Sequence, residues 1–173
     1  MKRIPAAVLK KAAKIKLLLL DVDGVLTDGR IIIDDRGVET KHFHVRDGQG
    51  ISLLMRSGVE VGFITGRSSK VVRHRACDLG VKLVYQGASN KLVCYGRIKR
   101  HTRLDDDNIA YMGDDMIDLP ILAQVGLAIT VADSWVELGK VVDFTTVARG
   151  GRGAVREVAE LLLKAQGKWP DLA

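Results

Sequence analysis

Residues 17–27 read Leu-Leu-Leu-Leu-Asp-Val-Asp-Gly-Val-Leu-Thr, and this stretch decides how the rest of the chain is interpreted. The apolar run that begins at Ile15 ends abruptly at Asp21, which is typical of a strand buried on both faces of a parallel sheet. Ligands of such sheets bind beyond the carboxyl ends of the strands, where Asp21 and Asp23 stand. Two carboxylates that close repel each other unless a cation or a proton joins them. Asp-x-Asp-Gly alone also fits a solvated turn, so the functional interpretation depends on the other motifs.

The composition indicates a single globular domain over residues 1–173, with 47% hydrophobic and 28% charged residues. No apolar run approaches the ~20 residues that span a membrane, and residues 1–16 lack an apolar stretch of signal-peptide length. Cys77 and Cys94 have no metal or redox spacing, which favours a reducing cytoplasm. The basic residues behind the net charge of +6 are scattered along the chain, and aromatic residues make up only 5%, so we expect no nucleic-acid partner. We interpret the excess of positive charge partly as a field that attracts a small anionic substrate.

Apolar runs alternate with helical patterns along the rest of the chain. Further strands are predicted over residues 60–65, 82–85, 108–112, 127–130 and 141–144. Helices are predicted over residues 5–13, 70–79 and 154–166, and three more are predicted without two fixed ends: one that ends near residue 56, one that begins near residue 91 and one that begins after residue 134. This alternation predicts an α/β fold of three layers, a Rossmann-like parallel sheet with helices on both faces.

Residues 29–45 interrupt the alternation and predict a β-hairpin insertion with its turn at 34–37. Ile31 to Ile33 place apolar side chains on both faces of this ribbon, which a free flap should not expose. We therefore expect the hairpin to be buried against another subunit, in a homo-oligomer.

Polar residues follow several of the predicted strands and should converge at one edge of the sheet. They are Asp21, Asp23, Thr65, Lys91, Asp114 and Asp118. Each has an ordinary structural explanation as a turn, surface or helix-terminus residue. Their joint appearance at successive strand ends indicates phosphoryl transfer through an aspartyl phosphate, with a divalent cation screening the anions.

Roles follow from that chemistry. Asp21 and Asp114 would supply carboxylates to Mg²⁺, together with a main-chain carbonyl near Asp23, and Asp118 would be a further ligand or a partner behind the ligands. The Asp23 side chain would protonate the leaving oxygen and later deprotonate water. Thr65 and Lys91 would hold the phosphoryl oxygens.

The segments 21–27, 65–67, Lys91 and 113–118 resemble the four motifs of the haloacid dehalogenase (HAD) superfamily of phosphohydrolases, in a capless form whose one insertion is the hairpin. The segments 43–48, 86–91 and 150–157 narrow the resemblance to the 3-deoxy-D-manno-octulosonate (KDO) 8-phosphate phosphatases of lipopolysaccharide biosynthesis. The resemblance implies a magnesium-dependent cytoplasmic enzyme with no membrane partner, assembled as a homotetramer in which a neighbouring subunit helps to close each site.

The resemblance also implies a set of substrate contacts. These are Asp23, His44, Val45, Arg46, Asp47, Gly48, Ser52, Arg67, Arg75 and Lys91. The sugar acid carries a carboxylate as well as a phosphate, and arginine matches a carboxylate in a two-pronged geometry. Arg46, Arg67 and Arg75 are candidates for that contact, and Arg152 is a candidate across a subunit boundary.

Other functions fit parts of this pattern. A phosphoacceptor signalling domain would need an Asp at the end of the third strand, where Gln86-Gly87 stands. A zinc site at His42 and His44 lacks a third ligand, and the loop at 150–153 lacks the Lys-Ser/Thr of a nucleotide-binding loop. Two alternatives stay open: a nine-carbon substrate, 2-keto-3-deoxynononate 9-phosphate, and a non-catalytic assembly module of a sugar-nucleotide pathway.

Overall fold

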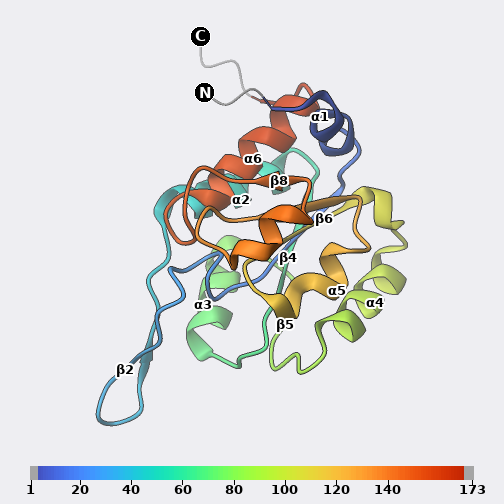
Figure 1. The fold of residues 1–173 in the computed structure, drawn as a ribbon. Helices are drawn as coiled ribbons and strands as arrows, with labels where there is room; N and C mark the ends of the chain where they lie inside the picture. Colours follow the sequence, from blue (N-terminus) through green and yellow to red (C-terminus); the bar gives the residue numbers. More distant parts are fainter. Residues whose placement is uncertain (1–3, 170–173) are drawn as a thin grey trace.

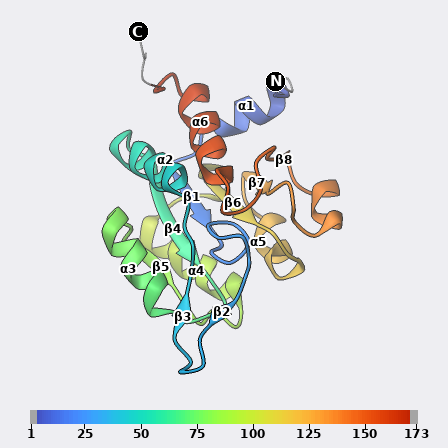
Figure 2. The same cartoon turned by 90° about the vertical axis from the view of Figure 1, so that its left-hand side faces the viewer.

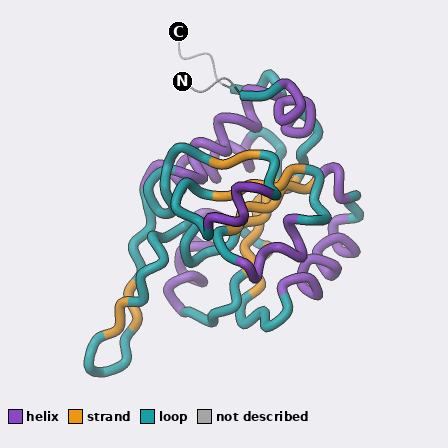
Figure 3. Tube along the Cα trace, in the orientation of Figure 1, coloured by secondary structure: helices purple, strands orange, loops and turns teal. Residues whose placement is uncertain are grey.

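Strand β1 (Leu17–Leu20) lies inside a six-stranded sheet in the computed structural model, which describes residues 4–169. The order is β5 (Leu83–Tyr85), β4 (Glu60–Ile64), β1, β6 (Ile109–Gly113), β7 (Leu127–Thr130) and β8 (Phe144–Thr145). Every neighbouring pair is parallel. Figure 3 shows these strands in orange among the purple helices. The predicted α/β fold with a parallel sheet is confirmed.

Both faces of the sheet are covered by helices (Figures 1 and 2). Leu18 and Leu20 of β1 point into one apolar cluster, and Leu17 and Leu19 point into the other. The first cluster includes residues of α1 (Ala6–Ala12), α2 (Val45–Arg56), α3 (Lys70–Leu79) and α6 (Ala154–Ala165). The second includes residues of α4 (Lys91–Thr102) and α5 (Leu119–Leu122). β1 is therefore completely buried because successive side chains of a strand enter opposite layers.

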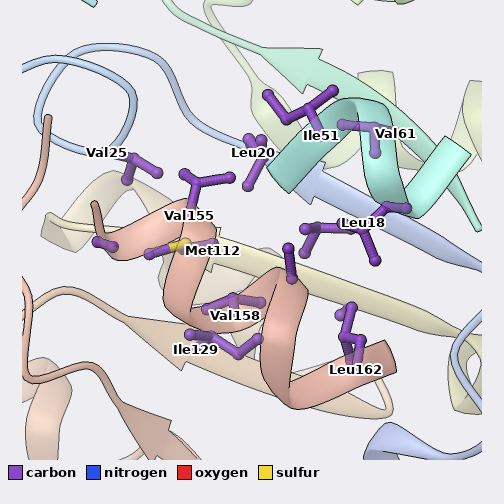
Figure 4. Packing of buried hydrophobic residues seen from close by; sticks show 14 of the residues in the cluster. Leu18, Leu20, Val25, Ile51, Val61, Met112, Ile129, Val155, Val158 and Leu162 are labelled. Carbon is purple, nitrogen blue, oxygen red and sulfur yellow. The ribbon is translucent and has the colours of Figure 1, made fainter. Parts of the chain in front are cut away.

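Helices α2 and α6 form the main contact over the first face (Figure 4). Ile51 of α2 and Val155 of α6 belong to the same apolar cluster, and Val158 and Leu162 continue the apolar side of α6 along the strands. These side chains are fully buried, which is the burial expected of the apolar stripe of an amphipathic helix. The packing fixes α2, and with it the loop that precedes α2, against the sheet.

The order of the strands creates a switch point at β1. The chain passes from β1 to β4 and β5 on one side, and then crosses to β6, β7 and β8 on the other side. Leu20 pairs with Phe63 of β4 and with Met112 of β6, so the carboxyl ends of these strands are level. Loops that leave a parallel sheet at such a point form its usual ligand-binding crevice.

The insertion after β1 is a small two-stranded hairpin, β2 (Ile32–Ile33) and β3 (Glu39–Thr40), that projects away from the rest of the molecule (Figures 1 and 2). Its turn ends at Gly37, whose φ of 77° is in the left-handed region that favours glycine. The prediction of a strand as far as Val45 is wrong, because Val45 begins α2. The hairpin's apolar side chains are exposed, namely Ile31, Ile32, Ile33 and Val38.

The last strand also differs from the prediction. Residues 136–140 form a 3₁₀ helix, η3 (Val136–Lys140), and the strand over 141–144 is reduced to β8 at Phe144–Thr145. Just before β8, Asp143 pairs with Ala128 through both its groups: its amide donates to the Ala128 carbonyl at 2.9 Å, and its carboxylate accepts from the Ala128 amide at 3.0 Å. Two further 3₁₀ helices are η1 (Asp106–Asn108) and η2 (Met116–Asp118). From residue 4 to residue 169, no helix has the length and apolarity needed to cross a membrane.

Candidate active site

Asp21 is the first residue after β1, and its backbone keeps the register of the sheet by donating to the Met112 carbonyl at 2.9 Å. The side chain is buried, with 5% of the residue exposed. One carboxylate oxygen, Oδ1, accepts the Val22 amide at 2.7 Å, and Oδ2 lies 2.8 Å from the ammonium nitrogen of Lys91. Burial raises the pKa of Asp21 to about 6, against the lowering effect of Lys91.

Lys91 is the first residue of α4 and reaches Asp21 from the second face of the sheet. Its Nζ also lies 2.7 Å from Oδ1 of Asp118, so one ammonium group bridges two buried carboxylates. Burial by itself lowers the pKa of Lys91, but attraction to Asp21 and Asp118 outweighs it and the pKa is raised. Lys91 is therefore a fixed positive charge at the end of β1.

Asp118 lies behind this pair and has both oxygens engaged. Oδ1 accepts from Lys91 and, at 2.6 Å, from the hydroxyl of Tyr111, while Oδ2 accepts the Asp114 amide at 3.0 Å and the Asp115 amide at 3.3 Å. The side chain has no exposed surface. Asp118 was expected to be either a metal ligand or a partner behind the ligands. These contacts favour the second role, in which Asp118 orients the Lys91 side chain and the backbone at Asp114 and Asp115. Tyr111 was not predicted, because within the sequence it is one more apolar residue of a buried strand.

Asp114 follows β6 and lies over the loop that follows β1. A Cβ placed on Gly24 would lie only 1.9 Å from Oδ2 of Asp114, and the φ of Gly24 is +90°. Only glycine satisfies both conditions, so Gly24 allows the Asp114 carboxylate to approach the loop after β1, residues 21–27, which we call the catalytic loop after its predicted role. Burial, reinforced by Asp21 and Asp118, raises the pKa of Asp114 to about 8.

The three carboxylates fit a divalent cation. Ligand atoms of Asp21, Asp114 and Asp118 lie within 4.8 Å of one another, and one ammonium group faces them. Three acids beside one base leave excess negative charge in a buried place, which explains the raised pKa values and is relieved by a cation. Magnesium prefers such oxygen ligands. Because Asp118 is fully engaged, Asp21 and Asp114 are the carboxylates best placed to hold it.

Asp23 has a different environment from Asp21. Its Oδ1 forms a short ion pair with the ammonium of Lys41, and its Oδ2 is buried without a hydrogen-bond partner. Arg67 Nε lies 3.8 Å from that oxygen, and the Arg67 guanidinium donates to Glu39 at 3.0 Å. Lys41 and Glu39 were not predicted, since alternation along a hairpin strand does not reveal where a lysine side chain ends.

Thr65 is the first residue after β4, the strand that pairs with β1. It is almost completely buried, with 2% of the residue exposed. Its amide donates to the Tyr85 carbonyl at 2.9 Å, and its hydroxyl accepts the Arg67 amide at 3.3 Å. Thr65 therefore follows β4 at the same edge of the sheet at which Asp21 follows β1.

Two of the predicted substrate contacts around α2, Val45 and Gly48, lie beside Arg75 of α3. A Cβ on Gly48 would lie 2.3 Å from Arg75 Nη2, and the Arg75 guanidinium lies 5.6 Å from the centre of the Phe43 ring. His44 Nδ1 is buried without a partner, and Ser52 Oγ donates to the Gly48 carbonyl at 3.1 Å. A cavity of about 390 Å³ lies here, lined by Phe43, Val45, Val71, His74, Arg75 and Asp78. Arg46 is exposed on the first turn of α2.

The side chain of Asp47 has a structural role. Its carboxylate is buried and caps the N-terminus of α6, because Oδ1 accepts the Arg156 amide at 2.8 Å and Oδ2 accepts the Gly153 amide at 3.1 Å. Both oxygens satisfy amides that a helix terminus leaves without partners. This contact joins α2 to α6, and the substrate contact predicted for Asp47 stays a prediction.

The glycine loop before α6 packs on the catalytic loop. A Cβ on Gly150 would lie 1.8 Å from the Gly24 carbonyl oxygen, and the Gly151 amide donates to the Val25 carbonyl at 2.9 Å. Arg152 in this loop is exposed, with Nη2 3.8 Å from Asp28 Oδ2. The loop therefore packs against residues 24–27. Arg152, the candidate for a contact across a subunit boundary, is exposed to solvent within the single chain.

Comparison with known proteins places this geometry among hydrolases. No protein-family model matches the chain. The 3-deoxy-D-manno-octulosonate 8-phosphate phosphatase of Escherichia coli K12 is 48% identical over 165 residues, which is 95% of this chain and 88% of that protein. The structure of the Yersinia pestis phosphatase of the same name has a TM-score of 0.93 at 47% identity, covering 94% of this chain and 88% of that one.

Two further structures are informative. A Legionella pneumophila structure described as a hydrolase of the HAD superfamily, subfamily III A, has a TM-score of 0.92 at 46% identity, covering 94% of this chain and 89% of that one. A Moraxella catarrhalis octulosonate 8-phosphate phosphatase, in complex with magnesium, phosphate and KDO, has a TM-score of 0.90 at 42% identity, with 92% of each chain covered.

The parallel sheet, with three aspartates gathered where its strand order reverses, defines the class of protein. It is a phosphatase of the HAD superfamily, as the resemblance of the motifs predicts. At these levels of identity and coverage, the chain belongs to the 3-deoxy-D-manno-octulosonate 8-phosphate phosphatase family.

Proposed function

We propose that this protein hydrolyses 3-deoxy-D-manno-octulosonate 8-phosphate to KDO and phosphate, in lipopolysaccharide biosynthesis, with Mg²⁺ as its cofactor. The observation that carries the proposal is the buried cluster of Asp21, Lys91, Asp114 and Asp118 at the switch point of the sheet. A scaffold has no need of three buried carboxylates around one lysine, since such burial costs stability. The names of the relatives supply the substrate, and the Moraxella complex supports the cofactor.

The reaction has two steps. In the first, a carboxylate oxygen of Asp21 attacks phosphorus, the bond from phosphorus to the sugar oxygen breaks, and Asp23 gives a proton to that oxygen. In the second, water attacks phosphorus, Asp23 takes the proton of the water, and phosphate leaves with Asp21 restored. Bound between Asp21 and Asp114, magnesium would neutralise charge on the transferring group.

Lys91 and Thr65 hold the phosphoryl group during both steps. Lys91 already lies 2.8 Å from Asp21, so a phosphoryl group on that carboxylate meets a positive charge without any rearrangement of the chain. The hydroxyl of Thr65 can donate to a second phosphoryl oxygen. Donors that are fixed before the reaction stabilise developing charge most effectively.

Selectivity for a sugar acid depends on the cavity beside Arg75. The guanidinium is held by Phe43 and covers Gly48, where a side chain would displace it. Arg75 can therefore meet the carboxylate of the substrate in a fixed orientation. Arg67, Arg46 and Arg152 remain secondary candidates. The same arrangement accepts a nine-carbon acid, so 2-keto-3-deoxynononate 9-phosphate is the alternative substrate.

Release of phosphate from a panel of sugar phosphates tests the proposal. We expect the highest kcat/KM with octulosonate 8-phosphate, and loss of activity when magnesium is removed with a chelator. A preference for the nine-carbon acid would support the alternative substrate. Absence of phosphate release from every member, with magnesium present, would contradict the enzyme assignment and favour an assembly module.

Assembly as a homotetramer in the cytoplasm completes the proposal. The exposed Ile31, Ile32, Ile33 and Val38 support it, since large apolar side chains grouped on a projecting hairpin are usually covered. Cys77 and Cys94 are both free, which fits a reducing compartment. Light scattering should give a mass about four times that of the chain, and a stable monomer at working concentration would contradict the assembly.

A further inference from the structure

Lys41 is the feature that the proposed reaction leaves unexplained. It directly follows β3 at the base of the hairpin, and only 1% of its side chain is exposed. Lysine is almost never buried to this extent unless its charge is paired. Its ammonium contacts Oδ1 of Asp23, and Oε1 of Glu39 lies 3.3 Å away.

Asp23 depends on this lysine for its orientation. Within residues 4–169, Lys41 is the one hydrogen-bond donor to the Asp23 carboxylate. Arg67 Nε, at 3.8 Å from Oδ2, is too distant for a hydrogen bond. The two oxygens are therefore unequal: Oδ1 is held by an ammonium group, and Oδ2 has no donor.

We propose that Lys41 is a positioning residue, which fixes through Oδ1 the orientation in which the Asp23 carboxylate exchanges a proton with the leaving group and with water. The inference rests on the proposed function, because it gives Asp23 the acid and base role described above. A carboxylate free to rotate would place the proton correctly only part of the time, and proton transfer requires hydrogen-bond reach.

The lysine is itself held in place by the hairpin. Glu39 accepts from Arg67 at 3.0 Å and lies 3.3 Å from Lys41, so this carboxylate joins the two cations that flank Asp23. Arg67 follows the end of β4, and Glu39 belongs to β3. The base of the hairpin is thereby attached to the catalytic loop by charge pairs, and not only by the chain that connects them.

The test compares two leaving groups. Release of a sugar alkoxide needs a proton, whereas p-nitrophenolate leaves without one. We expect Lys41→Met to lower kcat/KM for octulosonate 8-phosphate by at least about tenfold and for p-nitrophenyl phosphate by less than about threefold. Lys41→Arg, which keeps the charge but changes the geometry, should show the same discrimination and replaces Lys41→Met if that variant does not fold.

A double-mutant cycle separates positioning from a general effect on the fold. Added to Asp23→Asn, Lys41→Met should cause no further loss, because its effect passes through Asp23. Lys11→Met, which removes an ion pair with Asp143, is the control and should not change the ratio between the two substrates.

Equal losses on both substrates, or a full additional loss in the Asp23→Asn background, would overturn the role of Lys41. Failure of the proposed function is distinguishable from either result, because the unmodified protein would then release no phosphate from the sugar acid.

Discussion

The ammonium nitrogen of Lys91 lies 2.8 Å from Oδ2 of Asp21, so the proposed acceptor of the phosphoryl group is ion-paired in the buried interior. Loss of this cation would leave Asp21 and Asp118 as adjacent buried carboxylates. Breaking a buried pair costs roughly 3–5 kcal/mol. In chelator, we expect Lys91→Met to lower the free energy of unfolding by about 3 kcal/mol in urea titrations.

Lys99→Met is the matched control on the same helix. Lys99 pairs with Asp106 at 2.7 Å but has 31% of its side chain exposed, and surface pairs contribute about 1 kcal/mol or less. Equal stability of the Lys91→Met variant and the unmodified protein would show that Lys91 does not compensate the buried acids.

Magnesium should stabilise the protein more strongly as pH rises. Burial raises the pKa of Asp114 to about 8 and that of Asp21 to about 6 in the folded metal-free chain. The unfolded chain releases these protons near pH 4, so the metal-free protein loses stability as pH rises from about 4 to about 8. Because magnesium binds the ionised acids, its effect on Tm should grow between pH 6 and pH 8.

Thermal melts with and without magnesium at several pH values measure this growth. Asp114→Asn, which removes the group with the higher pKa, should reduce both the Tm gain and its pH dependence. A magnesium-induced Tm gain that is constant, or that falls as pH rises, would contradict the assignment of Asp114.

Much of the site could be predicted because parallel strands end at one edge. Asp21, Thr65 and Asp114 each follow a strand, and the rule that such ends converge brings them together without knowledge of the packing. Prediction of Lys91 as a site residue required one further inference, that the helix beginning at Lys91 starts near the same edge of the sheet.

The contacts that could not be predicted join segments whose separation in sequence carries no local signal. Asp47 caps a helix whose amides are 106 and 109 residues away, and Lys41 meets Asp23 only because the hairpin turns back on the catalytic loop. Alternation of the neighbouring residues predicts a strand as far as Val45, whereas the extended backbone ends at His44, the N-cap of α2, and Val45 is the first residue of that helix.

Asp47→Ala should reduce stability more than activity. The loss of a helix cap costs about 0.5–2 kcal/mol, and here two amides of α6 lose their acceptor. We expect a fall of about 2 kcal/mol in urea titrations with little change in KM. Asp34→Ala, which removes an exposed acceptor in the hairpin turn, should cost less. Unchanged stability with a raised KM would support the substrate contact predicted for Asp47.

Arg75→Ala should weaken discrimination for the sugar acid. Removal of a charged hydrogen bond costs at least ~1.4 kcal/mol, so kcat/KM for octulosonate 8-phosphate should fall by about tenfold or more. p-Nitrophenyl phosphate has no carboxylate, and its kcat/KM should change little. Arg73→Ala, exposed on the same helix, is the control. Equal losses on both substrates would assign Arg75 to the phosphate or to the fold.

The central claim, that Asp21 accepts the phosphoryl group, is tested most directly by rapid quenching with substrate labelled in its phosphoryl group, followed by peptide mapping. We predict transient label on the peptide that contains Asp21, and neither label nor turnover in a folded Asp21→Asn variant. Label recovered on another residue, or near-normal turnover by Asp21→Asn, would contradict the account.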